Sequence, residues 1–406
     1  MEIGRKGMVG NGHTSRDWKG DGQWILNGQY LNHTGIGHFI SDFGMRPSSA
    51  VALLRRMEIS PACGRQGFFS AIRNLNWRVM LLDPFRRKIN YLRISITDRC
   101  NLRCRYCMPE EGIPLIPHEE ILTYEEILRI VRVFATEGIS KVRLTGGEPL
   151  VRKGIVDFVS RLSQIEEIKD LSLTTNGILL KEFAQDLKKA GLKRINISLD
   201  SLRMERFYQI TRKDDFERVW AGIEEALRVG LSPIKINMVA IQGVNDDEIE
   251  SFARLTLRLP LIVRYIEYMP SGNGEEWKES DILTIPQIKS RLENIGELIP
   301  IPSDRWDGPA KRFQIKGAIG EIGMIGAVSS HFCDDCNRLR LTPDGKIRTC
   351  LFSDEEIDVK ELLRNGGSDR DLKDQLLVAL KKKPERHHIN THQFKKCQRN
   401  MSAIGG

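Results

Sequence analysis

Ser95-Ile-Thr-Asp-Arg-Cys-Asn-Leu-Arg-Cys-Arg-Tyr-Cys-Met108 places three cysteines on a loop directly after a short apolar segment. Their spacing, Cys100-x3-Cys104-x2-Cys107, is not that of a disulfide framework, which a chain of 406 residues does not need. Thiolates packed within a few residues of one another suit a soft metal or an iron–sulfur cluster. The stretch therefore predicts a metal-binding loop that follows a β-strand.

A second cysteine group lies far along the chain. It has the spacing Cys333-x2-Cys336-x13-Cys350, and like the first group it offers three thiolates and no obvious local fourth. Structural zinc takes four protein ligands, whereas a [4Fe–4S] cluster held by three cysteines keeps one iron open for another ligand. Clusters are therefore favoured at both groups. Zinc completed by His331 or Cys397 remains the alternative at the second group.

Apolar segments rich in β-branched residues alternate with amphipathic segments from Asp83 onward. Thr123 and Glu126 form a plausible capping box before the first helix. This order implies a parallel sheet, as an open doubly wound sheet or a full or partial barrel, with functional groups at the carboxyl ends of the strands. The expected strands are 91–97, 141–145, 170–175, 193–199, 234–241 and 261–269, and the expected helices are 124–136, 155–162, 182–190, 216–229 and 246–257.

Composition divides the chain into four parts. A basic leader, residues 1–82, has no repeating apolar period and is expected to be disordered or a transit peptide; the strand and helix alternation fills residues 83–270. A less regular region follows at 271–386, and a flexible tail at 387–406 ends in Gly-Gly.

The net charge of +8 sits near the N-terminus. Residues 1–88 hold 13 Lys and Arg against 6 Asp and Glu, which leaves 49 against 48 in the rest of the chain. The body is nearly neutral, so the basic pI does not predict a nucleic-acid surface. No apolar run approaches the roughly 20 residues that a bilayer span needs. We therefore expect neither nucleic acid nor a membrane as a partner.

The leader resembles an organelle transit peptide, since arginine, serine and alanine are frequent between Met45 and Met80 and Glu58 is the only acid there. A basic leader without an address explains the composition equally well. The first reading predicts the mitochondrial matrix and the second the cytoplasm. Both compartments keep thiols reduced, as the clusters require.

Cations interrupt several of the predicted strands. Arg93, Arg143, Lys235 and Arg264 each lie in an otherwise apolar segment, and burying an unpaired cation costs several kcal/mol. Ion pairs at the sheet rim or exposure at an edge would explain one such residue. Four on separate strands favour an anionic ligand, and a polyphosphate suits Arg forks and Lys point charges. Arg194 is left as a structural cation.

The cysteine loop and Thr145-Gly-Gly-Glu-Pro149 resemble the two signature motifs of the radical S-adenosylmethionine (SAM) enzymes. Two further segments resemble the GTP 3′,8-cyclase family of molybdenum cofactor synthesis. They are Cys333-Asp-Asp-Cys-Asn-Arg-Leu-Arg-Leu-Thr342, with Cys350, and the ending Met401-Ser-Ala-Ile-Gly-Gly406. The likeness runs from about residue 83 to residue 406.

The resemblance implies a partial (β/α)6 TIM-type barrel whose C-terminal extension carries a second [4Fe–4S] cluster. It implies SAM and two clusters, each held by three cysteines, as cofactors. It also assigns roles to individual residues. Those implied are Cys100, Cys104, Cys107, Cys333, Cys336 and Cys350 for iron; Tyr106, Gly147, Ser198 and Met269 for SAM; Arg93, Arg143, Thr174, Lys235, Arg264, Arg338, Leu339 and Arg340 for GTP; and Cys100, Cys104, Cys107, Arg338, Arg340, Gly405 and Gly406 for catalysis.

The implied reaction is a radical cyclisation. A hydrogen leaves the ribose 3′ carbon of GTP, that carbon attacks C8 of guanine, and 3′,8-cyclo-7,8-dihydro-GTP results. The implied partners are an electron donor of unknown identity, the next enzyme, cyclic pyranopterin monophosphate synthase, and a second copy of the chain in a homodimer. A peptide-modifying radical SAM maturase and a zinc-stabilised nucleotide-binding module are the alternatives, and the second leaves the first cysteine group unexplained.

Overall fold

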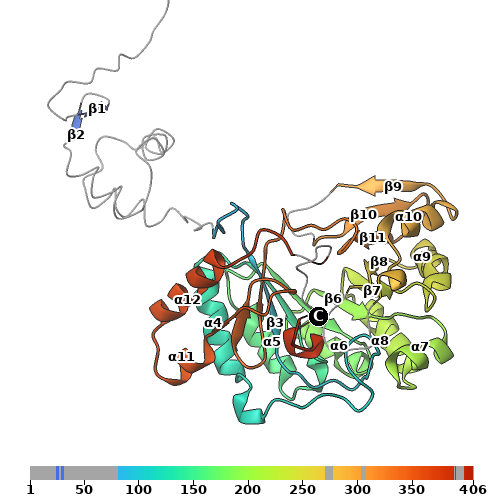
Figure 1. Ribbon diagram of the computed structural model, residues 1–406, viewed down its shortest axis with the longest axis horizontal. Coiled ribbons are helices and arrows are strands. Elements are labelled where there is room, and N and C mark those ends of the chain that lie inside the picture. Colours follow the sequence, from blue (N-terminus) through green and yellow to red (C-terminus); the bar gives the residue numbers. More distant parts are fainter. Residues whose placement is uncertain are drawn as a thin grey trace, which may run out of the picture. The chain divides into compact units, whose positions relative to one another are not determined.

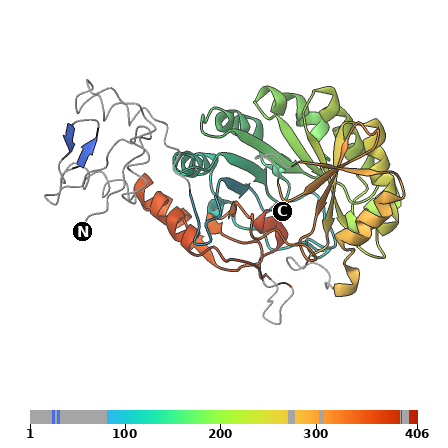
Figure 2. The ribbon, with the colours of Figure 1, turned by 90° about the horizontal axis from the view of Figure 1, so that it is seen from above.

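Six parallel strands form the centre of the fold, in the order in which they occur along the chain. They curl into a half-barrel whose helices cover the outer side (Figures 1 and 2), so the predicted partial barrel is confirmed. The strands are β3 (Tyr91–Ser95), β4 (Lys141–Thr145), β5 (Asp170–Thr175), β6 (Arg194–Ser198), β7 (Ile234–Ala240) and β8 (Leu261–Glu267).

The structure is a computed structural model that describes residues 81–269, 278–302, 308–387, 389 and 397–405, together with two short leader strands. Those strands, β1 (Trp24–Leu26) and β2 (Gln29–Leu31), pair antiparallel; the rest of the predicted 1–82 leader, apart from residues 81 and 82, lies outside the described residues. Met1–Trp77 and Arg78–Gly406 are separate units. None of the described helices is long and apolar enough to cross a membrane.

The helices follow the predicted segments with two differences. Thr123 caps the first helix, because its hydroxyl accepts from Glu126 N at 3.1 Å and the Glu126 carboxylate accepts from Thr123 N at 2.7 Å. A helix at Met204–Thr211 (α7) was not predicted, and Asp246–Glu248 forms a 3-10 turn before α9. The outer helices are α4 (Tyr124–Thr136), α5 (Ile155–Ser163), α6 (Leu180–Lys189), α8 (Phe216–Arg228) and α9 (Ile249–Arg258).

The C-terminal region extends both edges of the half-barrel. β12 (Arg338–Leu341) pairs parallel with β3, and β11 (Glu321–Ile325) pairs parallel with β8. The chain thus adds strands on each side and builds one twelve-stranded sheet. The remaining elements are β9 (Leu298–Ile301), β10 (Lys311–Ile315), β13 (Lys346–Arg348), β14 (Glu356–Asp358), α10 (Ile285–Glu293), α11 (Lys360–Arg364), α12 (Asp369–Lys381) and α13 (Met401–Ile404).

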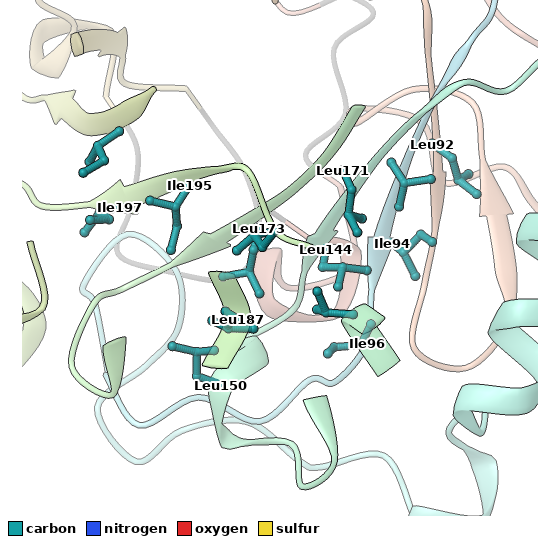
Figure 3. Close-up of a cluster of buried hydrophobic side chains, with 14 of the residues drawn as sticks. Leu92, Ile94, Ile96, Leu144, Leu150, Leu171, Leu173, Leu187, Ile195 and Ile197 are labelled. Atoms are coloured by element: carbon teal, nitrogen blue, oxygen red, sulfur yellow. The ribbon is translucent and has the colours of Figure 1, made fainter. Parts of the chain in front are cut away.

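Side chains alternate between the two faces of the sheet, as the pleat requires. One set of every strand is apolar and packs under the helices, including Leu92, Ile94, Leu144, Leu173 and Ile195 (Figure 3). The other set therefore faces the inside of the half-barrel. Most of its members are polar, and these make up the site described next.

Candidate active site

A row of arginines crosses the inner face of the sheet. Arg340 on β12 lies opposite Arg93 on β3, which in turn lies opposite Arg143 on β4. Lys235 and Arg264 add their charges from β7 and β8, and both are buried. The predicted cations therefore converge on one face of the sheet.

Four of the arginines on this face lack carboxylate partners among the described residues. Among the described residues, no ion pair joins an Asp or Glu to Arg143, Arg264, Arg338 or Arg340, whereas Arg194 Nε donates to Asp170 Oδ1 at 2.6 Å. Burial first, and then the neighbouring Arg143, lower the pKa of Arg264 to about 9. Burial and Arg338 lower that of Arg340 to about 10. This face therefore calls for an anion, and Arg194 is structural, as the sequence suggested.

Unsatisfied polar atoms mark the same region. Thr174 Oγ1, Arg264 Nε and Arg338 Nε are buried and have no hydrogen-bond partner within the described part of the chain. Such groups are uncommon in folded proteins unless a ligand or water completes them. Their placement beside the arginines fits a ligand that carries several acceptor oxygens.

The first cysteine loop packs tightly against the end of β4. Gly147 N donates to Thr97 O at 2.7 Å, and Glu148 N donates to Arg99 O at 2.8 Å. A Cβ at Gly147 would lie 2.3 Å from Arg99 O, so only glycine fits here. The loop is thereby fixed at the carboxyl end of the strands, where SAM is expected.

Negative charge on one thiolate of this loop makes the neighbouring thiols harder to deprotonate. Burial and then Glu148 raise the pKa of Cys100 to about 11, and burial followed by Cys107 and Cys100 raises the pKa of Cys104. Three nearby thiols with raised pKa values need a cation to hold them as thiolates, and cluster iron would supply that charge. The donor set therefore fits an iron–sulfur cluster.

The second cysteine group lies at the opposite end of the sheet. Cys336 precedes β12 and Cys100 follows β3, and these two strands run parallel. Lys383 is buried beside this group, where its Nζ lies 3.5 Å from Cys336 Sγ and donates to Arg338 O at 2.9 Å. Although burial alone would raise it, Arg338 and Lys383 lower the pKa of Cys336 to about 7.

Cys397, one of the two residues that could complete a zinc site at this group, has other partners. Cys397 Sγ accepts from Arg348 Nη2 at 2.9 Å and donates to Asp354 Oδ1 at 3.0 Å, so other partners engage this thiol. No three His, Cys, Asp or Glu side chains of the described residues are arranged to hold a single metal ion. Cys333 and Cys336 nevertheless share a turn in which Cys336 N donates to Cys333 O at 3.1 Å.

The predicted SAM residues lie at the carboxyl ends of their strands. Ser198 ends β6, Met269 follows β8 by two residues, and Tyr106 lies on the cysteine loop. The Tyr106 hydroxyl donates to Asp200 Oδ2 at 2.5 Å, and Asp200 Oδ1 accepts from Val239 N at 2.8 Å. Burial raises the pKa of Asp200 to about 6. Asp200 thus positions Tyr106, a role that no local pattern in the sequence revealed.

The C-terminal tail enters the site. Arg340 Nη1 donates to Gly405 O, and Ser95 Oγ donates to Ser402 O at 3.3 Å. The C-terminus and α13 lie at the centre of the half-barrel, beside β3 (Figure 1). Gly405 therefore lies beside Arg340 on the inner face, whereas Gly406 lies outside the described residues. The Leu339 side chain packs in the apolar core, which leaves only its backbone for a ligand.

A network of charges holds the start of this tail. Arg399 Nη1 and Nη2 donate to the two carboxylate oxygens of Asp344 at 3.0 and 2.8 Å, and Arg399 Nη2 also donates to Glu356 Oε2 at 2.7 Å. Asp354 Oδ1 accepts from Gln398 N at 3.1 Å. The segment that carries Gly405 is thus bound to the turn between β12 and β13 and to the start of β14, on either side of Cys350 in the sequence.

We expect Arg399→Ala to release the tail. Hydrogen bonds between charged groups contribute enough that their loss corresponds to roughly a 10- to 100-fold change in an equilibrium. Carboxypeptidase should therefore trim the C-terminus of the variant about tenfold faster or more, as mass spectrometry would detect. Arg228→Ala is the matched control, because Arg228 makes a similar two-pronged contact with Glu225 on an exposed helix. Equal trimming of wild type and Arg399→Ala would refute the role of Arg399 in holding the tail.

The sequence matches two family models, that of the radical SAM superfamily over residues 94–256 and that of Molybdenum Cofactor Synthesis C over residues 261–389. The crystal structure of Streptococcus suis SuiB bound to S-adenosylmethionine superposes with a TM-score of 0.52 at 16% identity, covering 93% of this chain and 94% of that one. At this identity the likeness shows a shared fold.

Two bacterial relatives are much closer in sequence. The GTP 3′,8-cyclase of Thermodesulfovibrio yellowstonii is 52% identical over 326 residues, 80% of this chain and 99% of that protein. The GTP 3′,8-cyclase of Heliobacterium modesticaldum is 51% identical over 327 residues, 80% of this chain and 100% of that protein. By its two cysteine groups, its cationic half-barrel and these relatives, the chain belongs to the GTP 3′,8-cyclase family of the radical SAM superfamily.

Proposed function

We propose that this protein converts GTP to 3′,8-cyclo-7,8-dihydro-GTP, the first step of molybdenum cofactor synthesis. The observation that carries the proposal is a set of arginines, Arg143, Arg264, Arg338 and Arg340, that have no carboxylate partner among the described residues and lie between two cysteine groups at opposite ends of one sheet. A nucleoside triphosphate supplies the anion that these cations need. The cyclases that are about half identical to this chain act on the same class of compound by name.

The first cysteine loop is the place for the [4Fe–4S] cluster of the superfamily and for SAM. When bound, the cluster supplies the electron that cleaves SAM and so provides the radical that takes a hydrogen from the nucleotide. Tyr106, Gly147, Ser198 and Met269 are proposed to hold SAM, because they lie on this loop and at or just after the carboxyl ends of β4, β6 and β8. The absent side chain of Gly147 keeps the loop against β4, and Asp200 holds the Tyr106 ring.

The inner face of the sheet would orient GTP between the two ends. Arg143, Arg264 and Arg340 neutralise phosphate oxygens, and Thr174 Oγ1 gains the hydrogen bond that it lacks among the described residues. Because these groups are buried, water has little access to the reacting carbon once the site is filled. Fixed placement of the ribose supplies the specificity, since the 3′ hydrogen must lie beside the radical.

The second cysteine group is proposed to hold another [4Fe–4S] cluster, whose open iron would ligate the guanine base. One support is the position of the group at the far end of the cationic face. The other is Arg338, which lies two residues after Cys336 in the sequence. The ammonium group of Lys383 would balance the negative charge of the thiolates.

Iron content separates this cluster from zinc. Cys336→Ala should lose about half of the iron of the anaerobically reconstituted protein, because one of two similar clusters loses a ligand. Cys397→Ala should keep the full iron content, since Cys397 bonds to Arg348 and Asp354 instead. Metal analysis that finds zinc in the wild type, released by Cys397→Ala, would establish the alternative.

Isotope transfer tests the function itself. The protein is incubated anaerobically with SAM, a strong reductant and GTP deuterated at the ribose 3′ position, and the 5′-deoxyadenosine formed is analysed by mass spectrometry. Deuterium in this product is the expected result. Unlabelled 5′-deoxyadenosine, formed at a rate indifferent to GTP, would refute GTP as the substrate and favour a maturase.

The compartment and the protein partners remain predictions. The leader lies almost entirely outside the described residues, and the relatives named above are bacterial, so they lend the mitochondrial address no support. An intact leader on protein isolated from cells would contradict a cleaved transit peptide. A homodimer, an electron donor and transfer of product to cyclic pyranopterin monophosphate synthase complete the proposal.

A further inference from the structure

Two tyrosine hydroxyls, those of Tyr91 and Tyr124, are buried without a hydrogen-bond partner in the described part of the chain. Buried hydroxyl groups normally find a partner, so each of these two needs an explanation. Their surroundings differ sharply, and the difference indicates which of them awaits a ligand.

Tyr124 lies on the outer side of the fold, at the start of α4. Its ring stacks on Phe158 with centroids 4.2 Å apart, and the Arg152 guanidinium lies 4.2 Å from its ring centroid. Burial raises the pKa of this tyrosine to about 12. The ring is held by packing, and the nearby Arg152 guanidinium is already engaged, because its Nη1 and Nη2 donate to Ile96 O and Leu122 O at 2.5 and 2.7 Å.

Tyr91 begins β3 on the inner face, where it is 3% exposed. Lys141 Nζ lies 4.8 Å and Arg143 Cζ lies 5.5 Å from its ring centroid, and Arg338 is its neighbour on β12. Although burial alone would raise it, Arg143, Arg93 and Lys141 together lower the pKa of Tyr91. Tyr91 therefore lies among several cations of the half-barrel.

The neighbours of Tyr91 can donate hydrogen bonds but cannot accept one, because Lys and Arg carry no acceptor. The carboxylate in the same row across the sheet, Asp170, is two strands away, about 10 Å at the usual strand spacing. It is also engaged, since Lys141 lies 3.4 Å from its Oδ2 and Arg194 donates to both oxygens. The Tyr91 proton thus has no acceptor on the neighbouring strands.

We propose that the Tyr91 hydroxyl is a further substrate contact, which donates a hydrogen bond to a phosphate oxygen of the bound nucleotide. The inference rests on the proposed function and adds a neutral donor to a set of cations. A phenol discriminates differently from an arginine, because it offers one directed hydrogen and no net charge. Tyr91 therefore favours a particular placement of the phosphate chain over mere attraction of anions.

Tyr91→Phe tests this contact, because it keeps the ring over Lys141 and Arg143 and removes only the hydroxyl. The measurement is the anaerobic equilibrium binding of GTP, GDP, GMP and guanosine to the cluster-loaded protein. We expect a Kd for GTP that is about 10- to 100-fold higher in the variant, as for loss of a hydrogen bond to a charged group, and a penalty that shrinks as phosphates are removed. Tyr124→Phe is the matched control and should bind GTP like the wild type.

The outcomes separate the two levels of the argument. Wild-type protein that does not bind GTP would overturn the proposed function, and this inference with it. Wild-type affinity for GTP in Tyr91→Phe would overturn the inference alone. A penalty that persists undiminished with guanosine would also overturn it, because the acceptor would then lie on the ribose or the base. SAM binding should be unchanged, because the proposed contact of this hydroxyl is with the nucleotide. Unchanged SAM binding would show that the variant is folded.

Discussion

Replacing Gly405 by alanine should lower turnover by about 100-fold or more, while iron content and SAM binding stay at the wild-type level. Gly405 has φ +86°, and a Cβ there would lie 2.3 Å from Thr145 Oγ1 and 3.1 Å from Ser95 Cβ. Thr145 and Ser95 end two central strands and are buried, so they cannot yield. The tail must leave its place and carry Gly405 away from Arg340.

Gly366→Ala is the control for the backbone conformation of Gly405. Gly366 has φ +78°, but a Cβ there meets nothing within 4 Å, so the substitution imposes only the left-handed strain of about 1 to 2 kcal/mol. Its turnover should stay close to that of the wild type. Removal of Gly405 and Gly406 together should abolish turnover while the iron content stays at the wild-type level. Undiminished turnover in either tail variant would show that the tail has no part in the reaction.

Gly147→Ala should disable the first cluster. The added Cβ would lie 2.3 Å from Arg99 O and 2.7 Å from Asp98 O, and both atoms belong to the backbone of the cysteine loop. The loop can relieve the collision only by moving away from β4, which breaks the hydrogen bonds from Gly147 N and Glu148 N. We expect a loss of iron and a fall of about 100-fold in SAM cleavage measured without GTP.

Gly308→Ala provides the comparison for this second variant. A Cβ at Gly308 has open space within 4 Å, so this variant should keep its iron and its SAM cleavage. The effect of Gly147→Ala should appear in the absence of any nucleotide, unlike that of Gly405→Ala. Iron content and SAM cleavage equal to the wild type would show that the loop tolerates displacement from β4.

The barrel strands were predictable because each is a local pattern. β4 and β5 have the predicted bounds, and the other four strands differ only at their ends, where the chain leaves the sheet. The sequence did not predict that β11 and β12 join the edges of the half-barrel. Pairing between segments more than 200 residues apart, such as β3 and β12, leaves no periodicity for a reader of the sequence. The helix α7 was not predicted because it is short.

The residues of the candidate site likewise divide into those that the sequence predicted and those that it did not. Cysteine spacing and cations inside apolar strands are visible in the sequence, and the structure brings the cations together on one face. Asp200, Lys383 and Arg399 gave no signal, because each is a single polar residue whose partner is distant along the chain. Tyr91 read simply as a strand residue, and only its orphaned hydroxyl distinguishes it.

β12 pairs with β3, and the C-terminal tail packs beside both strands. These contacts fix the order in which parts of the site can form while the chain is synthesised. A ribosome must finish residues 338–341 before the strand beside β3 exists, and it must reach residue 405 before Arg340 meets the tail. Messages cut short by a premature stop codon therefore yield chains without a complete reaction chamber. Radical chemistry on the nucleotide therefore requires that translation has passed residue 405.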